Sequence, residues 1–341
     1  MNLLIKNCKE IHVCGDHHTG PLKGVAMADP GSLKDAYIDI RDGKIHDYGL
    51  MVNCPSDSFF DEITNAQGCH VLPSWVDSHT HLVYHLSREG EFVMRIQGKS
   101  YEEIAAAGGG ILNSARKLSQ ASEDELFDQA WHRLQEVIGF GTGAIEIKSG
   151  YGLSFESELK MLRVIKRLKN KSPITIKSTF LGAHAFPVEY KSNRQAYIDL
   201  LTENLLPVIS EEKLADYIDV FCDEGFFTVE ETRHILSKGS EYGLRGKIHA
   251  NELANSGGVQ IGVEMKALSV DHLERIAQPE IECLKDSNTF PVALPSTSFF
   301  LNLPYAPGRK MIDAGLPLVL ASDYNPGSTP SGKIPFLLSL A

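Results

Sequence analysis

The sequence predicts an α/β fold, a (β/α)8 barrel of the TIM type preceded by a small β unit. Eight apolar, β-rich runs recur between residues 70 and 321, and helical periodicity lies between many of them. Residues 1–66 instead contain short extended stretches. Eight strands that alternate with helices fit a closed barrel. Strand counting alone also allows an open doubly wound sheet.

The first 66 residues are expected to form the small β unit. The stretch 35–40 alternates in polarity, Asp42-Gly43 follows, and a second extended stretch covers 45–48. An Asp-Gly pair between alternating runs is typical of a β-hairpin.

Residues 67–341 are expected to form the barrel domain. Helical periodicity is clearest over 122–138 and 156–170, and the chain stops soon after the eighth run, so we expect the barrel to be truncated after strand 8. The eight predicted strands cover 70–76, 142–147, 174–181, 216–222, 246–249, 267–271, 290–294 and 316–321.

Composition limits the classes of binding partner that are expected. The net charge of −11 argues against nucleic acid and anionic membranes. Charge appears too early for a signal peptide, no apolar run approaches the ~20 residues of a membrane span, and the six cysteines are scattered. A cytoplasmic protein with reduced thiols and a small-molecule substrate is therefore expected.

Four residues at the ends of predicted strands suit a metal. His79 and His81 stand two apart after the first run, so their side chains point the same way. His249 ends the fifth run and Asp323 follows the eighth. The His79/His81 pair alone is equally well explained as two polar histidines at a strand end, and a lone residue such as His249 or Asp323 is more often a cap or turn residue. Together, at the catalytic end of a barrel, they predict a divalent-metal site with an open water position.

The chain resembles the amidohydrolase superfamily and, within it, the imidazolonepropionase family. The motifs that carry the resemblance include Asp77-Ser-His-Thr-His-Leu82, Glu146-Ile-Lys-Ser-Gly-Tyr-Gly-Leu153, Leu181-Gly-Ala-His-Ala185, Ser269-Val-Asp-His-Leu-Glu274 and Asp323-Tyr-Asn-Pro-Gly327. The resemblance implies that residues 1–66 belong to a small β-sandwich whose C-terminal part is missing. It also implies hydrolysis of 4-imidazolone-5-propanoate to N-formimino-L-glutamate in histidine degradation.

The resemblance further implies roles for individual residues. His79, His81, His249 and Asp323 would bind one zinc or iron ion, because the fourth strand lacks the lysine of binuclear relatives. Glu252, His272 and Asp323 would be catalytic. Substrate would contact Arg88, Tyr101, Tyr151, His184, Glu252, Asn325, Gly327 and Ser328.

Two departures from the family pattern and two alternatives stay open. Glu252 stands where glutamine is commoner, which leaves the proton carrier open among Glu252, Asp323 and His272, and His85 could reach the metal or face the pocket rim. A cytosine- or guanine-type deaminase would use the same metal site, and a catalytically inactive scaffold would keep only the barrel. A homodimer is possible.

Overall fold

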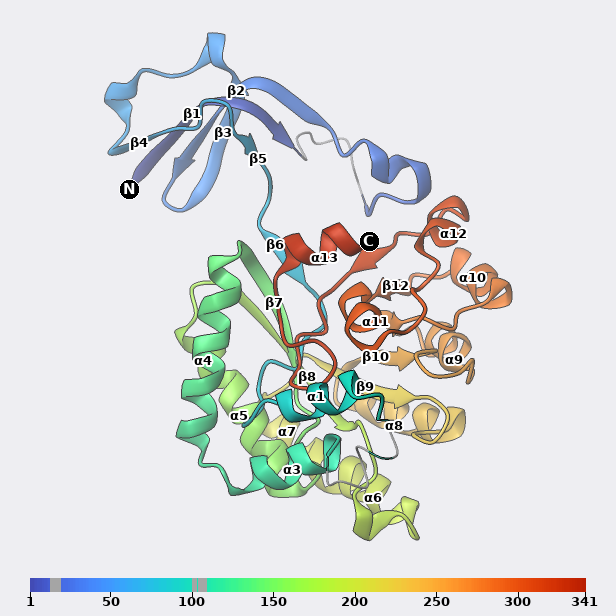
Figure 1. Ribbon diagram of the computed structural model, residues 1–341. Coiled ribbons are helices and arrows are strands. Elements are labelled where there is room, and N and C mark those ends of the chain that lie inside the picture. The colour runs from blue at the N-terminus through green and yellow to red at the C-terminus, as the bar shows by residue number, and fades with distance from the viewer. Residues whose placement is uncertain (13–19, 100–102, 104–108) are drawn as a thin grey trace. The chain divides into compact units, whose positions relative to one another are not determined.

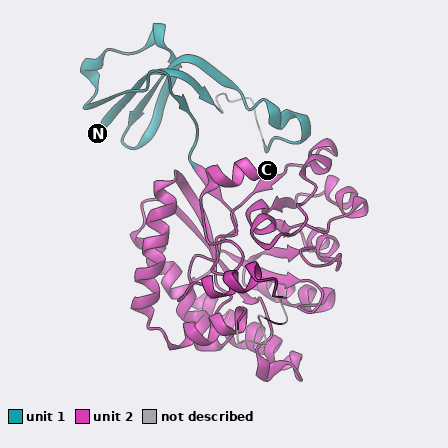
Figure 2. Ribbon diagram, in the orientation of Figure 1, with its two compact units in different colours: residues 1–74 teal, residues 75–341 magenta. Residues whose placement is uncertain are grey.

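The computed structural model describes residues 1–12, 20–99, 103 and 109–341. These residues divide into two compact units, Met1–Ser74 and Trp75–Ala341 (Figure 2). The division falls eight residues after the boundary at residue 66 that the sequence suggested.

The first unit is a five-stranded sheet in the order β3-β2-β1-β4, with the short β5 also paired to β1. Its hairpin joins β2 to β3, with Arg41 opposite Lys44, which confirms the Asp-Gly turn. Asp42 and Gly43 both have positive φ, as a two-residue hairpin turn requires. The strands are β1 Asn2–His12, β2 Ser32–Arg41, β3 Lys44–Leu50, β4 Glu62–Asn65 and β5 His70–Val71, with 3-10 turns at Gly24–Ala28, Met51–Asn53 and Asp57–Phe59.

The second unit is a barrel of eight parallel strands in sequential order, which confirms the predicted fold class (Figure 1). The first predicted run, 70–76, is divided between β5 and β6, because Pro73 lies between them and offers no backbone N–H. The barrel strands are β6 Trp75–Asp77, β7 Thr142–Lys148, β8 Thr175–Ala183, β9 Tyr217–Cys222, β10 Arg245–Ala250, β11 Ser269–His272, β12 Phe290–Ala293 and β13 Val319–Leu320.

Helices surround the strands (Figure 1). Both predicted long helices are confirmed: α4 begins at a capping box formed by Ser122 and Glu125, and α5 begins after Ser154, whose hydroxyl accepts a backbone N–H. The helices are α1 Glu89–Ile96, α3 Ile111–Gln120, α4 Glu123–Gly139, α5 Phe155–Lys171, α6 Arg194–Asp199, α7 Leu206–Glu211, α8 Val229–Glu241, α9 Gly258–Glu264, α10 Gln278–Lys285, α11 Pro295–Leu301, α12 Gly308–Asp313 and α13 Ile334–Leu340, with a 3-10 turn at Val188–Tyr190 and a π-helical segment at Leu200–Leu205.

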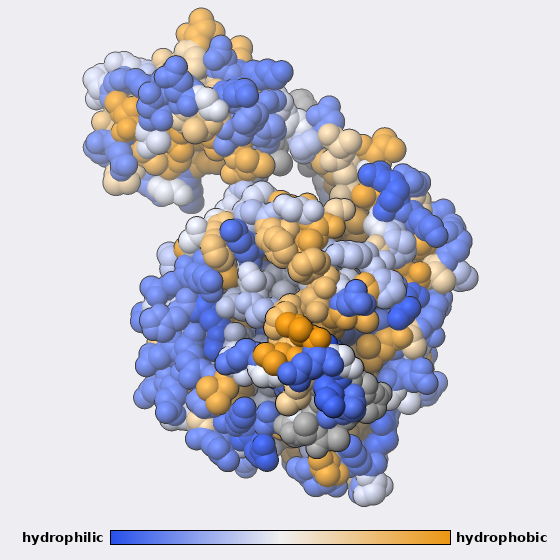
Figure 3. All heavy atoms as spheres, viewed as in Figure 1, coloured by the Kyte–Doolittle hydropathy of each residue, from blue (hydrophilic) through white to orange (hydrophobic). Residues whose placement is uncertain are grey.

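The core lies between the strands and the helices, where strand residues such as Ile147, Val220 and Ile248 are fully buried. The surface over α4 is mainly hydrophilic, whereas hydrophobic side chains gather over α1 (Figure 3). Among the described residues, none of the helices combines the length and the apolar character that a membrane span needs.

The first and last barrel strands, β6 and β13, meet at a seam held by isolated contacts between the residues that follow them. Thr80 and Tyr324 form an isolated parallel bridge, and the backbone N–H of Asp323 donates to the carbonyl of His79 at 3.0 Å. Deeper in the barrel, the carboxylate of Asp77 accepts from the N–H and the hydroxyl of Ser322 at 3.0 and 2.6 Å. Burial raises the pKa of Asp77 to about 6. The seam therefore sets the positions of the loops that carry three of the four predicted ligands.

Candidate active site

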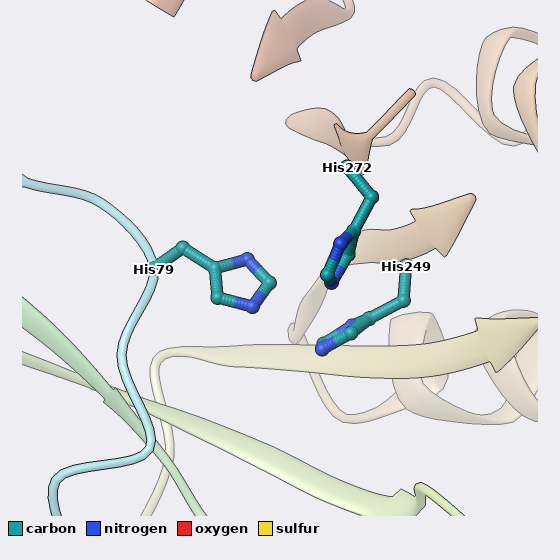
Figure 4. A group of neighbouring side chains, drawn as sticks. All are labelled: His79, His249 and His272. Atoms are coloured by element: carbon teal, nitrogen blue, oxygen red, sulfur yellow. The ribbon is translucent and has the colours of Figure 1, made fainter. Parts of the chain in front are cut away.

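The candidate site lies at the C-terminal ends of the barrel strands, where barrel enzymes carry their chemistry. His79 and His81 follow β6, His249 lies on β10, His272 ends β11 and Asp323 follows β13. Figure 4 shows that the rings of His79, His249 and His272 converge from three separate segments of the chain. A cavity of about 400 Å³ opens beside them, and its lining includes the predicted residues Arg88, Tyr151, His184, Glu252, Asn325, Gly327 and Ser328.

The four predicted ligands come together. Asp323 Oδ1 lies 3.6 Å from His79 Nε2 and 3.4 Å from His81 Nε2. The Nε2 atoms of His81 and His249 lie 3.4 Å apart. Ligand atoms on one tetrahedral ion are separated by about 3.4 Å. His79, His81 and Asp323 therefore have the spacing that a single divalent ion needs, and His249 lies beside His81.

Buried carboxylates fix the orientation of two of these rings. His79 Nδ1 donates to Asp271 Oδ2 at 2.6 Å, and His249 Nδ1 lies 3.1 Å from Asp219 Oδ2. Each carboxylate faces Nδ1 and leaves Nε2 toward the centre of the site, as is common around metal-binding histidines. Neither aspartate received a role from the sequence.

The donor atoms fit a metal. His79 Nε2 and Asp323 Oδ1 are buried without a hydrogen-bond partner, although such atoms are normally paired. Burial lowers the pKa of His79 and His81 well below the usual histidine range, and nearby positive groups lower it further. The rings are therefore neutral, which is the form that coordinates a metal.

Lys148 ends β7 and is sealed in an ion-pair network. Its Nζ donates to Glu146 Oε1 at 2.7 Å and to Asp219 Oδ2 at 2.8 Å. Burial opposes its charge, but Asp219 and Glu146 outweigh that effect and hold the pKa of Lys148 above its ordinary value. Lys148 therefore supports Asp219, which in turn faces His249.

Two site residues and one neighbour of Glu252 adopt left-handed backbone conformations: His272, Asp323 and Asn251 have φ values of 86°, 56° and 56°. Each follows or ends a barrel strand. A residue other than glycine in this region is strained by about 1–3 kcal/mol, and such strain concentrates at functional sites. At these positions the chain turns sharply, and the side chains of His272 and Asp323 reach the cavity.

Glu252 and His272 form a buried acid–base pair beside the predicted ligands. His272 Nε2 lies 3.5 Å from Glu252 Oε2, and its Nδ1 lies 3.6 Å from Glu274 Oε2. Burial raises the pKa of Glu252. Burial disfavours charge on His272 as well, but Glu252 and Glu274 outweigh that effect and raise its pKa. The pair can therefore hold a proton at the cavity wall.

Asp223 fixes the loop that carries Glu252. Its Oδ2 accepts the backbone N–H groups of Glu252 and Leu253 at 2.9 and 2.8 Å. Its Oδ1 accepts from the N–H of Ala254 and the hydroxyl of Ser256 at 3.1 and 2.8 Å. One buried carboxylate after β9 thus orders the whole turn after β10.

Arg88 lies against Gly327 at the cavity wall. A Cβ at position 327 would overlap the Nη2, Cζ and Nε atoms of Arg88. Arg88 Nε lies 3.7 Å from Glu91 Oε2, and Glu91 itself accepts the N–H of Gly110 at 2.9 Å. The guanidinium is therefore held between a glycine and a carboxylate, with its charge available to the cavity.

Tyr151 and His184 also line the cavity. His184 stacks on His81 with ring centroids 5.1 Å apart, and its Nδ1 donates to the carbonyl of Gly150 at 3.0 Å. Burial lowers the pKa of His184 to about 3 and raises that of Tyr151 above its ordinary value. Both side chains are therefore neutral hydrogen-bonding groups.

The other residues that the sequence singled out for the site have different neighbours. The Oδ1 of Asn325 accepts from the N–H groups of Gly327 and Ser328, both at 2.8 Å, so this amide shapes its own loop. His85 contacts Gln129 of α4 at 3.4 Å and is absent from the cavity lining. Tyr101 lies outside the described residues.

Comparison with curated proteins gives the family. The imidazolonepropionase of Flavobacterium johnsoniae is 54% identical over 341 residues, which cover all of this chain and 83% of the relative. The chain belongs to the imidazolonepropionase family. That of Thermoanaerobacter pseudethanolicus is 40% identical over 340 residues, covering all of this chain and 81% of the relative. No family model matches the chain.

Solved structures share the fold of this imidazolonepropionase family member at low identity. The 5-methylcytosine deaminase of Klebsiella pneumoniae, liganded with phosphonocytosine, has a TM-score of 0.70 at 16% identity, over 99% of this chain and 80% of the other. The guanine deaminase of C. acetobutylicum has a TM-score of 0.66 at 18% identity, over 100% of this chain and 78% of the other. An atrazine chlorohydrolase variant of Arthrobacter aurescens, complexed with zinc and atraton, has a TM-score of 0.65 at 14% identity, over 97% of this chain and 74% of the other.

Sequence reasoning missed several groups of this imidazolonepropionase-type site. The cavity is also lined by Glu91, Arg95, Phe221, Phe226, Leu301 and Leu303. The charged residues along α1 offered a usable signal, because Arg88, Glu91 and Arg95 recur at helical spacing on one face. The apolar residues offered none, since they resemble ordinary core positions.

Proposed function

We propose that this chain opens the ring of 4-imidazolone-5-propanoate by hydrolysis and yields N-formimino-L-glutamate. The observation that carries the proposal is that three members of the His3Asp set, His81, His249 and Asp323, line the same cavity as Arg88. A cytosine or guanine deaminase needs the metal ligands, but its substrate has no carboxylate for Arg88 to bind.

Binding would use the charged and neutral walls together. Arg88 would take the propionate through a two-point, charge-assisted contact. Tyr151 and His184 would hydrogen-bond the ring, because both are neutral and His184 has committed only its Nδ1. Phe221 and Phe226, stacked at 4.1 Å, would exclude water from the ring face.

His79, His81, His249 and Asp323 would hold one divalent ion. That ion would lower the pKa of the attacking water and polarise the ring carbonyl. The His3Asp set suits zinc or iron. The fit rests on the unpaired His79 Nε2 and Asp323 Oδ1 atoms.

Proton transfer would fall to the buried pair. Glu252 would accept a proton from water as the water oxygen bonds to the carbonyl carbon, and would return it to the ring nitrogen as the C–N bond breaks. His272, kept positively charged by Glu252 and Glu274, would donate to the oxygen on which charge develops. A raised pKa of Glu252 suits this exchange near neutral pH.

The test is turnover by the metal-loaded chain. We expect ring opening of imidazolone propionate with zinc or iron, and no deamination of cytosine or guanine under the same conditions. Elemental analysis of the same samples would establish which ion supports activity. A metal-loaded, folded protein that leaves imidazolone propionate intact would contradict the proposal.

A further inference from the structure

A second group of metal-ligating side chains lies in the Met1–Ser74 unit. Glu10 and His12 stand two residues apart on β1, so they project from the same face of the sheet. His70 begins β5 and pairs directly with Glu10 in the parallel register. Strand pairing therefore brings three ligands of types suited to zinc onto one patch.

The donor atoms are already close. His12 Nε2 lies 2.9 Å from His70 Nδ1, and Glu10 Oε2 lies 3.8 Å from the same nitrogen. One ligand atom from each side chain lies within 4.8 Å of the other two. Ligand atoms around a tetrahedral zinc ion are about 3.4 Å apart, so small rotations of the side chains would suffice.

The carboxylate is held in place for this role. Ser32 Oγ donates to Glu10 Oε1 at 2.5 Å and leaves Oε2 facing His70. The hydroxyl contact also lowers the pKa of Glu10, so the group is an anion at neutral pH. The rings of His12 and His70 stack at 5.2 Å with an interplanar angle of 17°.

A simpler explanation accounts for part of this geometry. A neutral imidazole can donate to its neighbour, and that hydrogen bond alone explains the short contact between His12 and His70. An ion pair between His70 and Glu10 would likewise account for the carboxylate at 3.8 Å, and the metal site is distinguished by all three donor atoms lying within 4.8 Å of one another. Lys34, opposite Glu10 on β2, adds a positive charge that weakens cation binding.

We propose that Glu10, His12 and His70 form a second divalent-metal site of the zinc type. The side chain of His70 is 42% exposed, so water can complete the coordination. The bound ion would fasten β5 to β1 and connect residues 58 positions apart in the chain. This site is independent of the hydrolytic chemistry.

Zinc stoichiometry of the full chain tests the site. Each protein is dialysed against zinc chloride and analysed for bound metal, with calorimetric titration of zinc into the metal-depleted chain. We expect His12→Ala and His70→Ala each to bind one zinc equivalent fewer than wild type. His46→Ala is the matched control, because His46 is exposed on β3 of the same sheet. Turnover should be unchanged in all three variants.

Two results would overturn the site. One is equal zinc content in wild type and in both variants. The other is loss of the same equivalent in His46→Ala, which would indicate nonspecific surface binding. If an alanine variant fails to fold, as judged by circular dichroism, His70→Gln keeps the size and polarity of the side chain and gives the same comparison.

Discussion

Replacing Gly327 with alanine tests how the cavity holds a carboxylate. The new Cβ would overlap the guanidinium of Arg88, which must retreat by roughly 2 Å to reach van der Waals distance. Losing a charge-assisted hydrogen bond removes about 1.5–3 kcal/mol. We therefore expect KM for imidazolone propionate to rise by about 10- to 150-fold, with metal content and melting temperature close to wild type.

A double-mutant cycle makes this prediction specific. Arg88→Met should raise KM similarly, and adding Gly327→Ala to it should have no further effect, since both changes remove one contact. Gly139→Ala is the steric control, because a Cβ added there would meet no atom within 4 Å and the residue ends α4. The reasoning fails if Gly327→Ala keeps KM within about twofold of wild type, or if the two substitutions prove additive.

Three further predictions concern the proton carrier, its loop and the metal. Glu252→Gln should lower kcat by about 10²- to 10⁴-fold while bound metal stays constant; parallel loss of metal would instead make Glu252 a structural residue. Asp223→Asn should change kcat by a larger factor than KM, because it disturbs the loop that carries Glu252. Ser256→Ala removes one of the four contacts between Asp223 and that loop and should lower kcat less. Steady-state kinetics at equal metal content measures both variants, and equal effects would refute the positioning role of Asp223. Chelation should lower the melting temperature, since an ion at 1,000 times its Kd adds about 4 kcal/mol; an unchanged melting curve would contradict binding at the four ligands.

The strand order and the convergence of His79, His81, His249 and Asp323 could be predicted because they follow from local patterns. Apolar runs mark barrel strands, and parallel strands bring their C-terminal ends together. The orienting roles of Asp219 and Asp271 could not be read in the same way, because they depend on which strands become neighbours. A buried aspartate inside an apolar run was nevertheless a signal, since such a charge is costly without a partner.

Contacts between side chains from distant segments could not be predicted from the sequence. The position of Arg88 against Gly327 depends on two segments 239 residues apart in the chain, and no local pattern indicates that these two segments meet. The division of the run 70–76 between two sheets was foreseeable, because Pro73 stands in its middle.

The seam between β6 and β13 has a consequence for how the chain matures during synthesis. Asp77 and Ser322 are separated by 245 positions, so their contact must await translation of almost the entire barrel. Contacts of such long range slow folding. Until they form, the edge of β6 is exposed to pairing with other chains. A ribosome-bound intermediate should therefore be recognised by chaperones until Ser322 leaves the exit tunnel, and completion of the metal ligands would coincide with its release.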